Sequence, residues 1–170
     1  MLTFLNLEAE GFCSIESLHL QLNPTCTILI KAPNGKGKST ILSALVWAIY
    51  GKNLKGVSEV NTWKQVRPKD YKGTKVQVYF QKDSHTYKIV RCQKYDEVLE
   101  DGAKGKDRLI FMKDGDIVDI KGKGKIQDFI NREIGLSYTL FMNSIMFGQG
   151  IKRLIQESNS DKKKIFEEVF

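Results

Sequence analysis

The sequence lacks long hydrophobic runs and the features of an export signal. No stretch of the 170 residues approaches the roughly 18–20 apolar residues that span a bilayer, so no transmembrane helix is expected. The first ten residues alternate Leu and Phe with Glu and Asn, whereas a signal peptide begins with basic residues and a short apolar block. The sequence therefore predicts an intracellular, cytoplasmic protein with no membrane partner.

Cysteine and histidine are scarce, with three and two copies. Cys13, Cys26 and Cys92 are far apart and form no CxxC or Cys/His pair, which indicates reduced thiols packed as small apolar residues and gives no support for zinc. His19 falls on the polar side of an alternating segment and is expected to be solvated.

Acidic residues are outnumbered, with 20 Asp and Glu against 27 Lys and Arg, a formal net charge of +7. This excess favours contact with phosphates of a nucleotide or a nucleic acid, but it also occurs in basic domains that bind neither. With 41% hydrophobic residues, the chain is long enough for one globular domain with its own core.

Three strands are predicted before residue 31. Leu2–Leu7 and Ile15–Leu22 alternate apolar and polar residues, as half-buried strands do, and a turn at Gly11–Ser14 separates them. Thr25–Ile30 is continuously β-branched or apolar, which predicts a strand buried on both faces of a sheet. Ile41–Tyr50 is apolar on nearly all sides and predicts a buried helix that ends at Gly51.

A loop rich in glycine and lysine lies between that last strand and the helix. Its residues are Asn34, Gly35, Lys36, Gly37, Lys38, Ser39 and Thr40. Strand, loop and helix are the context of a phosphate-binding P-loop, in which backbone N–H groups and a helix N-terminus surround a phosphate chain. This context argues against a chance Gly/Lys loop, and it predicts ATP and Mg²⁺ as ligands.

Each loop residue type has a chemical reason. Gly35 and Gly37 allow the backbone to approach the phosphates without a Cβ clash. Lys38 is expected to reach the β- and γ-phosphates, Ser39 Oγ to ligate Mg²⁺, and Thr40 to donate near the α-phosphate. The usual first glycine of the motif is Ala32 here, which would cost roughly 1 kcal/mol only if that position were left-handed.

The middle of the chain predicts two β-hairpins. Lys75–Phe80 and Thr86–Arg91 alternate around a short polar turn. Leu109–Met112 and Ile117–Ile120 flank Asp114-Gly115, a dipeptide suited to a tight turn.

The remaining segments are irregular or helical. Lys52–Gly73 has no periodicity and predicts a surface excursion, and Lys121–Lys125 predicts a flexible basic linker. Ile126–Ile134 and Leu136–Met146 predict two helices, and Asp161–Phe170 predicts the opening of another.

Several motifs together resemble one family. They are "GFCSI" in the first turn, "PNGKGKST" in the loop, "AIYG" closing the helix, "VQVYF" and "TYKIVR" in the first hairpin, "FMNSIMFGQG", and "SDKKKIFEEVF". This order resembles the N-terminal lobe of SMC-like ABC ATPases, and within them the SbcC/Rad-fifty group, the ATPase subunits of double-strand-break nuclease complexes, including phage recombination versions.

The resemblance implies an α/β fold: an N-terminal lobe of an ABC-type P-loop ATPase head, with a mixed sheet around the P-loop helix and an additional antiparallel β layer. It implies that 1–170 is a single lobe, half of a head. It further implies that 161–170 begins a helix leading toward a coiled-coil arm.

The resemblance also assigns roles outside the loop. It implies that Gln149 senses Mg²⁺ and the γ-phosphate, as a metal-binding and catalytic residue beside Lys38; from chemistry alone, an amide between glycines also suits a turn. The family's basic residue before the turn serine falls at Cys13, which cannot carry that charge. Ser14 remains available as a hydroxyl for the nucleotide.

Two parts of a complete ATPase head do not occur in the sequence. There is no LSGGQ-like signature, and Leu109–Met112 is followed by Lys113-Asp114, which we interpret as a hairpin turn and a false Walker B. The resemblance implies that the catalytic carboxylate and signature lie in a C-terminal lobe, and that ATP drives dimerisation with a second copy. We therefore expect this chain to bind ATP with negligible turnover.

A nuclease subunit and double-stranded DNA are the further partners that the resemblance implies. Basic residues that suit a DNA backbone occur in two groups, namely Lys64, Arg67, Lys69, Lys72 and Lys75 around the single acid Asp70, and Lys121, Lys123 and Lys125. Three alternatives remain open: an ABC transporter subunit, a small P-loop kinase, for which the expected arginine-rich lid is lacking, and a non-enzymatic DNA clamp.

Overall fold

The computed structural model describes residues 1–23, 27–62, 64, 67–146, 158–160, 162–163 and 167. Its strands are β1 (Leu2–Phe12), β2 (Ile15–Gln21), β3 (Thr74–Lys82), β4 (His85–Gln93), β5 (Tyr95–Val98), β6 (Lys104–Lys106), β7 (Leu109–Lys113) and β8 (Asp116–Ile117). Its helices are α1 (Lys38–Tyr50), α2 (Lys123–Ile134) and α3 (Tyr138–Ser144).

Six of the strands form one antiparallel sheet in the order β2-β1-β3-β4-β7-β8. Tight turns join neighbouring strands. Asp83 has a φ of 55° between β3 and β4, and Asp114 and Gly115 have φ of 51° and 93° between β7 and β8. Two successive positive φ angles are those of a type I′ turn, which matches the twist of the flanking strands. The first predicted hairpin is confirmed. The second is confirmed at its turn, but its second strand, predicted over Ile117–Ile120, is only Asp116–Ile117.

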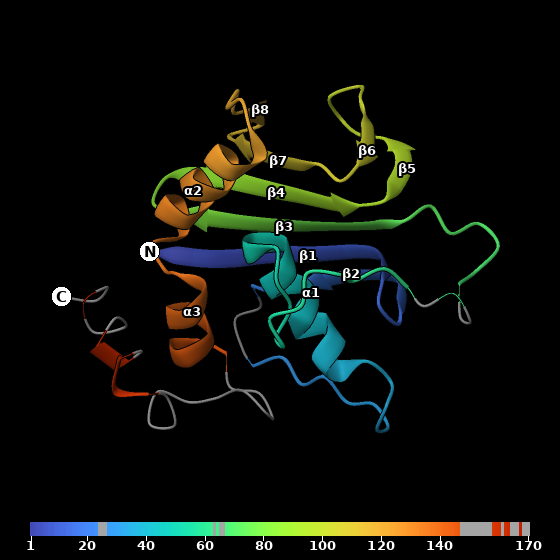
Figure 1. Ribbon diagram of the computed structural model, residues 1–170, viewed down its shortest axis with the longest axis horizontal. Helices are drawn as coiled ribbons and strands as arrows, with labels where there is room; N and C mark the ends of the chain where they lie inside the picture. Colours follow the sequence, from blue (N-terminus) through green and yellow to red (C-terminus); the bar gives the residue numbers. More distant parts are fainter. Residues whose placement is uncertain are drawn as a thin grey trace.

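One face of the sheet forms the main core. Val76, Val78 and Phe80 alternate along β3 and are fully buried on this face, where α1 packs against β1, β3 and β4. Helix α1 ends at Gly51, whose left-handed backbone donates its N–H to the carbonyl of Trp47. Figure 1 shows α2 and α3 near the end of the sheet where the chain begins. Among the described helices, none is long and apolar enough to cross a membrane.

The opposite face of the sheet carries a smaller apolar cluster. Val90, Cys92 and Ile110 project there from β4 and β7, and Tyr95 of the β5–β6 pair packs against them. The fold is therefore the α/β lobe with an antiparallel β layer that the sequence predicts.

The prediction of a buried strand at Thr25–Ile30 is wrong for the part that can be compared. Residues 27–30 form no strand, and Leu29 is 85% exposed; residues 24–26 lie outside the described part. The physical reason is the lack of a neighbour, because no described strand pairs with this segment on either side.

Two helix boundaries also differ from the predictions. Lys121–Lys125 is not wholly a linker, because α2 already begins at Lys123 and the N–H of Ile126 bonds to the carbonyl of Gly122. Helix α3 is shorter than predicted, since the Ser137 hydroxyl accepts the N–H of Leu140 and caps its start. Within the predicted helix 161–170, the described residues 162, 163 and 167 are helical.

Candidate phosphate-binding site

The loop before α1 curls through two left-handed glycines. Gly35 and Gly37 have φ of 79° and 82°, a region where a side chain is strained. Ala32, which replaces the usual first glycine, does not have a positive φ, so its Cβ introduces no such strain. Asn34 and Lys36, between the glycines, are exposed.

The Lys38 side chain folds back over this loop. Its ammonium donates to the carbonyls of Ala32 and Pro33, at 2.6 and 2.9 Å. The charge is therefore held beside the loop backbone, where a phosphate oxygen can exchange for a carbonyl as its partner.

The N-terminus of α1 is open to an anion. Its N-cap is Gly37, which offers no side-chain acceptor, and the first turn contains no acidic residue. The N–H groups of Thr40 and Ile41 bond to the Gly37 carbonyl, while Ser39 is exposed. The positive end of the helix dipole is thus not neutralised by a carboxylate of its own helix, as an anion site requires.

The turn between β1 and β2 brings Ser14 to this loop. A Cβ placed on Gly37 would lie 3.2 Å from Ser14 Oγ, so the two segments are in close contact. Cys13 has a φ of 52°, and its N–H donates to the Val60 carbonyl at 2.8 Å. Burial raises the pKa of the Cys13 thiol, which keeps it neutral near pH 7. The position therefore supplies no charge to a phosphate.

Gln149, the remaining predicted site residue, lies outside the described residues. Helix α3, the described helix that precedes it in the sequence, packs against the C-terminal end of α1. The Tyr50 hydroxyl donates to the Leu136 carbonyl at 2.9 Å, and the Tyr50 and Phe141 rings lie 5.4 Å apart.

A family model described as an AAA domain matches residues 6–170. The chain belongs to this AAA domain family. It is 23% identical over 165 residues to the DNA double-strand break repair Rad50 ATPase of Methanopyrus kandleri, and 29% identical over 163 residues to the probable Rad50 ATPase of Aquifex aeolicus. It is 26% identical over 155 residues to exonuclease subunit 2 of Escherichia phage RB69.

These alignments cover 94%, 95% and 89% of this chain but only 17%, 16% and 25% of the relatives. A solved structure described as the structural biochemistry of ATP-driven dimerization and DNA stimulated activation of SMC ATPases has a TM-score of 0.59. It is 19% identical and covers 99% of both chains, which establishes the shared fold. The resemblance to the SbcC/Rad-fifty group and the predicted fold class are confirmed.

A cleft of about 770 Å³ adjoins the phosphate loop of this AAA domain at Ser14. Its walls include Tyr71 and Arg67, whose guanidinium lies 4.7 Å from the Tyr71 ring centroid, and Tyr95 from β5. Its volume suits a small organic ligand. The sequence did not reveal the cleft, because its walls come from three distant segments, one of them without periodicity.

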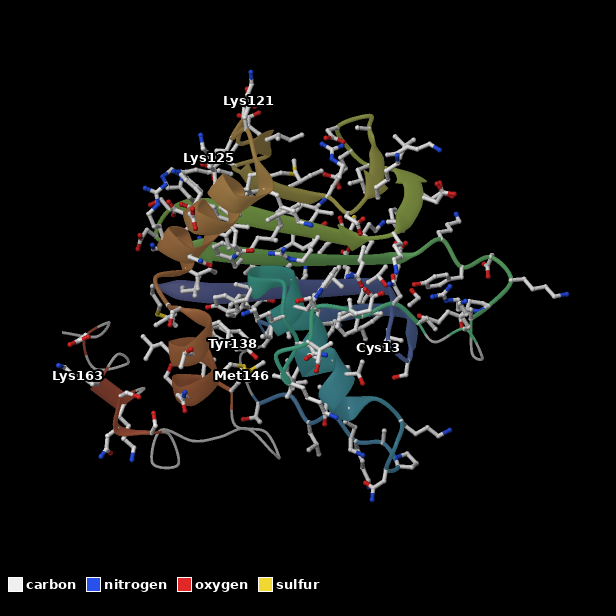
Figure 2. All side chains as sticks on the ribbon, viewed as in Figure 1. Cys13, Lys121, Lys125, Tyr138, Met146 and Lys163 are labelled. Carbon is white, nitrogen blue, oxygen red and sulfur yellow. The ribbon has the colours of Figure 1, made fainter. Side chains whose placement is uncertain are left out.

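The basic group between residues 64 and 75 contains both ion-paired and exposed lysines in the structure. Lys72 pairs with Glu97 at 3.0 Å, and Lys75 pairs with Glu10 at 2.8 Å with only 18% of its side chain exposed. The other two lysines of the group, Lys64 and Lys69, are exposed. The second group stays accessible. Figure 2 shows Lys121 and Lys125 pointing away from the body of the molecule, and the Lys123 ammonium donates to the Asp107 carbonyl at 2.9 Å.

Proposed function

We propose that this chain is the ATP- and Mg²⁺-binding lobe of an SMC-like ATPase that controls a DNA double-strand-break repair or recombination nuclease. The observation that carries the proposal is the uncapped α1 N-terminus, preceded by two left-handed glycines and by the Lys38 ammonium. These are the donors and the cation that a triphosphate requires.

The proposed roles follow the loop. Backbone groups of 34–37 surround the β-phosphate, Lys38 contacts the β- and γ-phosphates, and Ser39 ligates Mg²⁺. Thr40 would donate near the α-phosphate, and Gln149 is the residue proposed to sense Mg²⁺ and the γ-phosphate. The nucleoside then extends past Ser14 into the adjoining cleft, because Ser14 is common to the loop contact and to the cleft wall.

Hydrolysis, in this proposal, requires a further lobe that supplies the carboxylate and a signature loop from a second copy. Two features support this. Asp114 is the carboxylate that follows the apolar strand β7. It accepts the N–H of Thr86 at 2.9 Å and pairs with His85, so it is engaged in the hairpin turn and is not available to activate a water molecule. The apolar segment at Ile28 and Leu29 is exposed and offers a surface for strands of the second lobe.

DNA contact is proposed through the exposed lysines at the start of α2, namely Lys121, Lys123 and Lys125. Such contacts follow the phosphate backbone and weaken steeply with salt. Replacing all three with Gln and measuring duplex binding by the ATP-bound full-length protein across a salt series tests this. An unchanged salt slope contradicts the proposed DNA contact.

The proposal also includes a nuclease subunit as partner and a cytoplasmic location, which is the host cytoplasm if the protein is encoded by a phage.

The decisive test is calorimetric titration of MgATP into the wild type, Lys38→Ala and Lys36→Ala. We expect Lys38→Ala to weaken binding about 10- to 100-fold, because a charge-assisted phosphate contact is worth roughly 1.5–3 kcal/mol. Lys36 is exposed on the same loop, and its proposed phosphate contact is through its backbone, which the substitution keeps, so its side chain provides the matched control. Equal affinity of wild type and Lys38→Ala refutes the assignment. Turnover near ~1 per second by the 170-residue chain refutes the need for a second lobe.

A further inference from the structure

Arg91 is a buried cation at the C-terminal end of α1. Its side chain comes from β4 and the residue is 5% exposed. Nε donates to the Ala48 carbonyl at 2.9 Å, and Nη2 donates to the Ile49 carbonyl at 3.1 Å. In the described part of the chain, no carboxylate pairs with this guanidinium. Its charge is compensated by the carbonyl dipoles at the helix end, by the Gln127 amide oxygen and by the Trp47 ring, whose centroid lies 5.9 Å from the guanidinium carbon.

Neutral groups already close this helix end. Gly51 donates its N–H to the Trp47 carbonyl, and the Gln127 amide of α2 donates to the Ile49 carbonyl at 2.9 Å. Gln127 Oε1 also accepts a hydrogen bond from Arg91. The Trp47 and Ile49 carbonyls thus have neutral donors, and the Ala48 carbonyl needs only one further N–H, which a neutral amide side chain can supply. A guanidinium instead adds a full positive charge that has been removed from water at a free-energy cost.

That charge persists at neutral pH. Burial lowers the pKa of Arg91 to about 10, which leaves the guanidinium protonated near pH 7. Helix α1 spans 13 residues from Lys38 to Tyr50, so the charge lies about 15–20 Å behind the phosphate loop at roughly 1.5 Å per residue. The interaction between this charge and a bound phosphate acts through the protein core, so salt screens it less than an interaction through solvent.

We propose that Arg91 is a positioning residue for polyphosphate binding: it anchors α1 from the sheet and cancels the negative end of the helix dipole, so that the positive end acts on the phosphates unopposed. The inference rests on the proposed function of the loop. It adds a residue that touches neither phosphate nor metal and acts only through α1.

The test compares three variants by calorimetry after circular dichroism has verified their fold. Arg91→Gln removes the charge but keeps an N–H donor. Arg91→Lys keeps a cation in titrations near pH ~6.5, because a buried lysine with a lowered pKa is most protonated at the acidic end of the range. Gln127→Leu is the control that removes the neutral contacts to the same carbonyl and to Arg91 while the guanidinium stays. Each is titrated with AMP, ADP and ATP without Mg²⁺, so that ligand charge increases while the nucleoside is constant.

We expect Arg91→Gln to bind ATP about three- to tenfold more weakly, with a smaller loss for ADP and the smallest for AMP, as a Coulombic effect over this distance requires. Arg91→Lys and Gln127→Leu are expected to bind within about twofold of the wild type. A purely structural cap would give equal losses for the three nucleotides, or none in the folded protein. Either result overturns the inference.

If Arg91→Gln does not fold, Arg91→Lys decides the question: retention of ATP affinity supports the inference, and a loss of tenfold or more overturns it. Failure of the proposed function is distinguishable. In that case the wild type itself does not bind ATP, or Lys38→Ala binds it equally well. When the wild type binds and Lys38→Ala does not, a negative result with Arg91 concerns Arg91 alone.

Discussion

Gly73→Ala is expected to be among the most destabilising small substitutions in this protein. Gly73 precedes β3 with a φ of 103°, and a Cβ there would lie 2.1 Å from the Lys94 carbonyl oxygen. That contact is with backbone, so no side chain can rotate away. Ordinary contact would require the two segments to separate by more than about 1 Å.

The magnitude follows from two contributions. The positive φ costs roughly 1–2 kcal/mol for any residue with a Cβ. Forcing apart packed backbone adds about 1–3 kcal/mol, as overpacking does elsewhere. The total of roughly 2–5 kcal/mol is a large part of the 5–15 kcal/mol that stabilises a typical domain. At about 2–4 °C per kcal/mol for a chain of this size, the melting temperature should fall by roughly 5–20 °C.

Gly56→Ala is the matched control, because Gly56 has a φ of 76° and no atom lies within 4 Å of the point that a Cβ would occupy there. It isolates the conformational contribution from the steric one. Thermal unfolding followed by circular dichroism compares the two variants under identical conditions. If Gly73→Ala melts within about 2 °C of Gly56→Ala, the close backbone contact between Gly73 and Lys94 does not exist in solution.

Three further predictions concern a turn, a thiol and Gln149. The Thr86 N–H and then His85 hold the pKa of Asp114 below its usual range, so the stability it contributes is present above the unfolded pKa of about 3.9 and is lost as pH falls through the folded value. Asp114→Asn should therefore reduce the fall in melting temperature between about pH 5 and pH 2, measured by calorimetry; an unchanged fall contradicts this. Burial raises the pKa of Cys92 to about 12, so iodoacetamide near pH 8 should label its peptide in mass spectra only after unfolding. Gln149→Ala should leave ATP affinity intact but impair ATP-driven responses of the full-length protein, and a loss of binding would argue against its proposed role.

The hairpin turns and the loop that precedes α1 were predictable because their signals are local. Alternation with period two gives the inward faces of β3 and β4, and Asp114-Gly115 specifies its own turn. The β5–β6 pair was missed because short strands such as Lys104–Lys106 contain glycine and charges and no apolar alternation. The pair is instead held against the main sheet by Tyr95, which packs with Val90 and Ile110, and such a long-range contact leaves no local signal in the sequence.

The error at Thr25–Ile30 has a different cause. A continuously apolar segment indicates that both of its faces need to be covered. The pattern does not indicate which other residues cover them. In the described part of the chain nothing covers Leu29. Arg91, by contrast, left a usable signal: it continues the inward series of Tyr87 and Ile89 on β4, where a charged residue is out of place unless it has a buried partner.

The position of β1 in the sheet has a consequence for synthesis on the ribosome. Of the strands in the six-stranded sheet, β1 emerges first, yet it lies between β2 and β3. Strand β3 begins at Thr74, about 60 residues after β1 ends at Phe12. At roughly 5–20 residues per second, β1 waits about 3 to 12 seconds for its second neighbour. During that time the β1–β2 hairpin has an unpaired edge, and the apolar α1 has no complete sheet to cover it. The nascent chain is therefore most prone to aggregation, or to capture by a chaperone, between the emergence of α1 and that of β3.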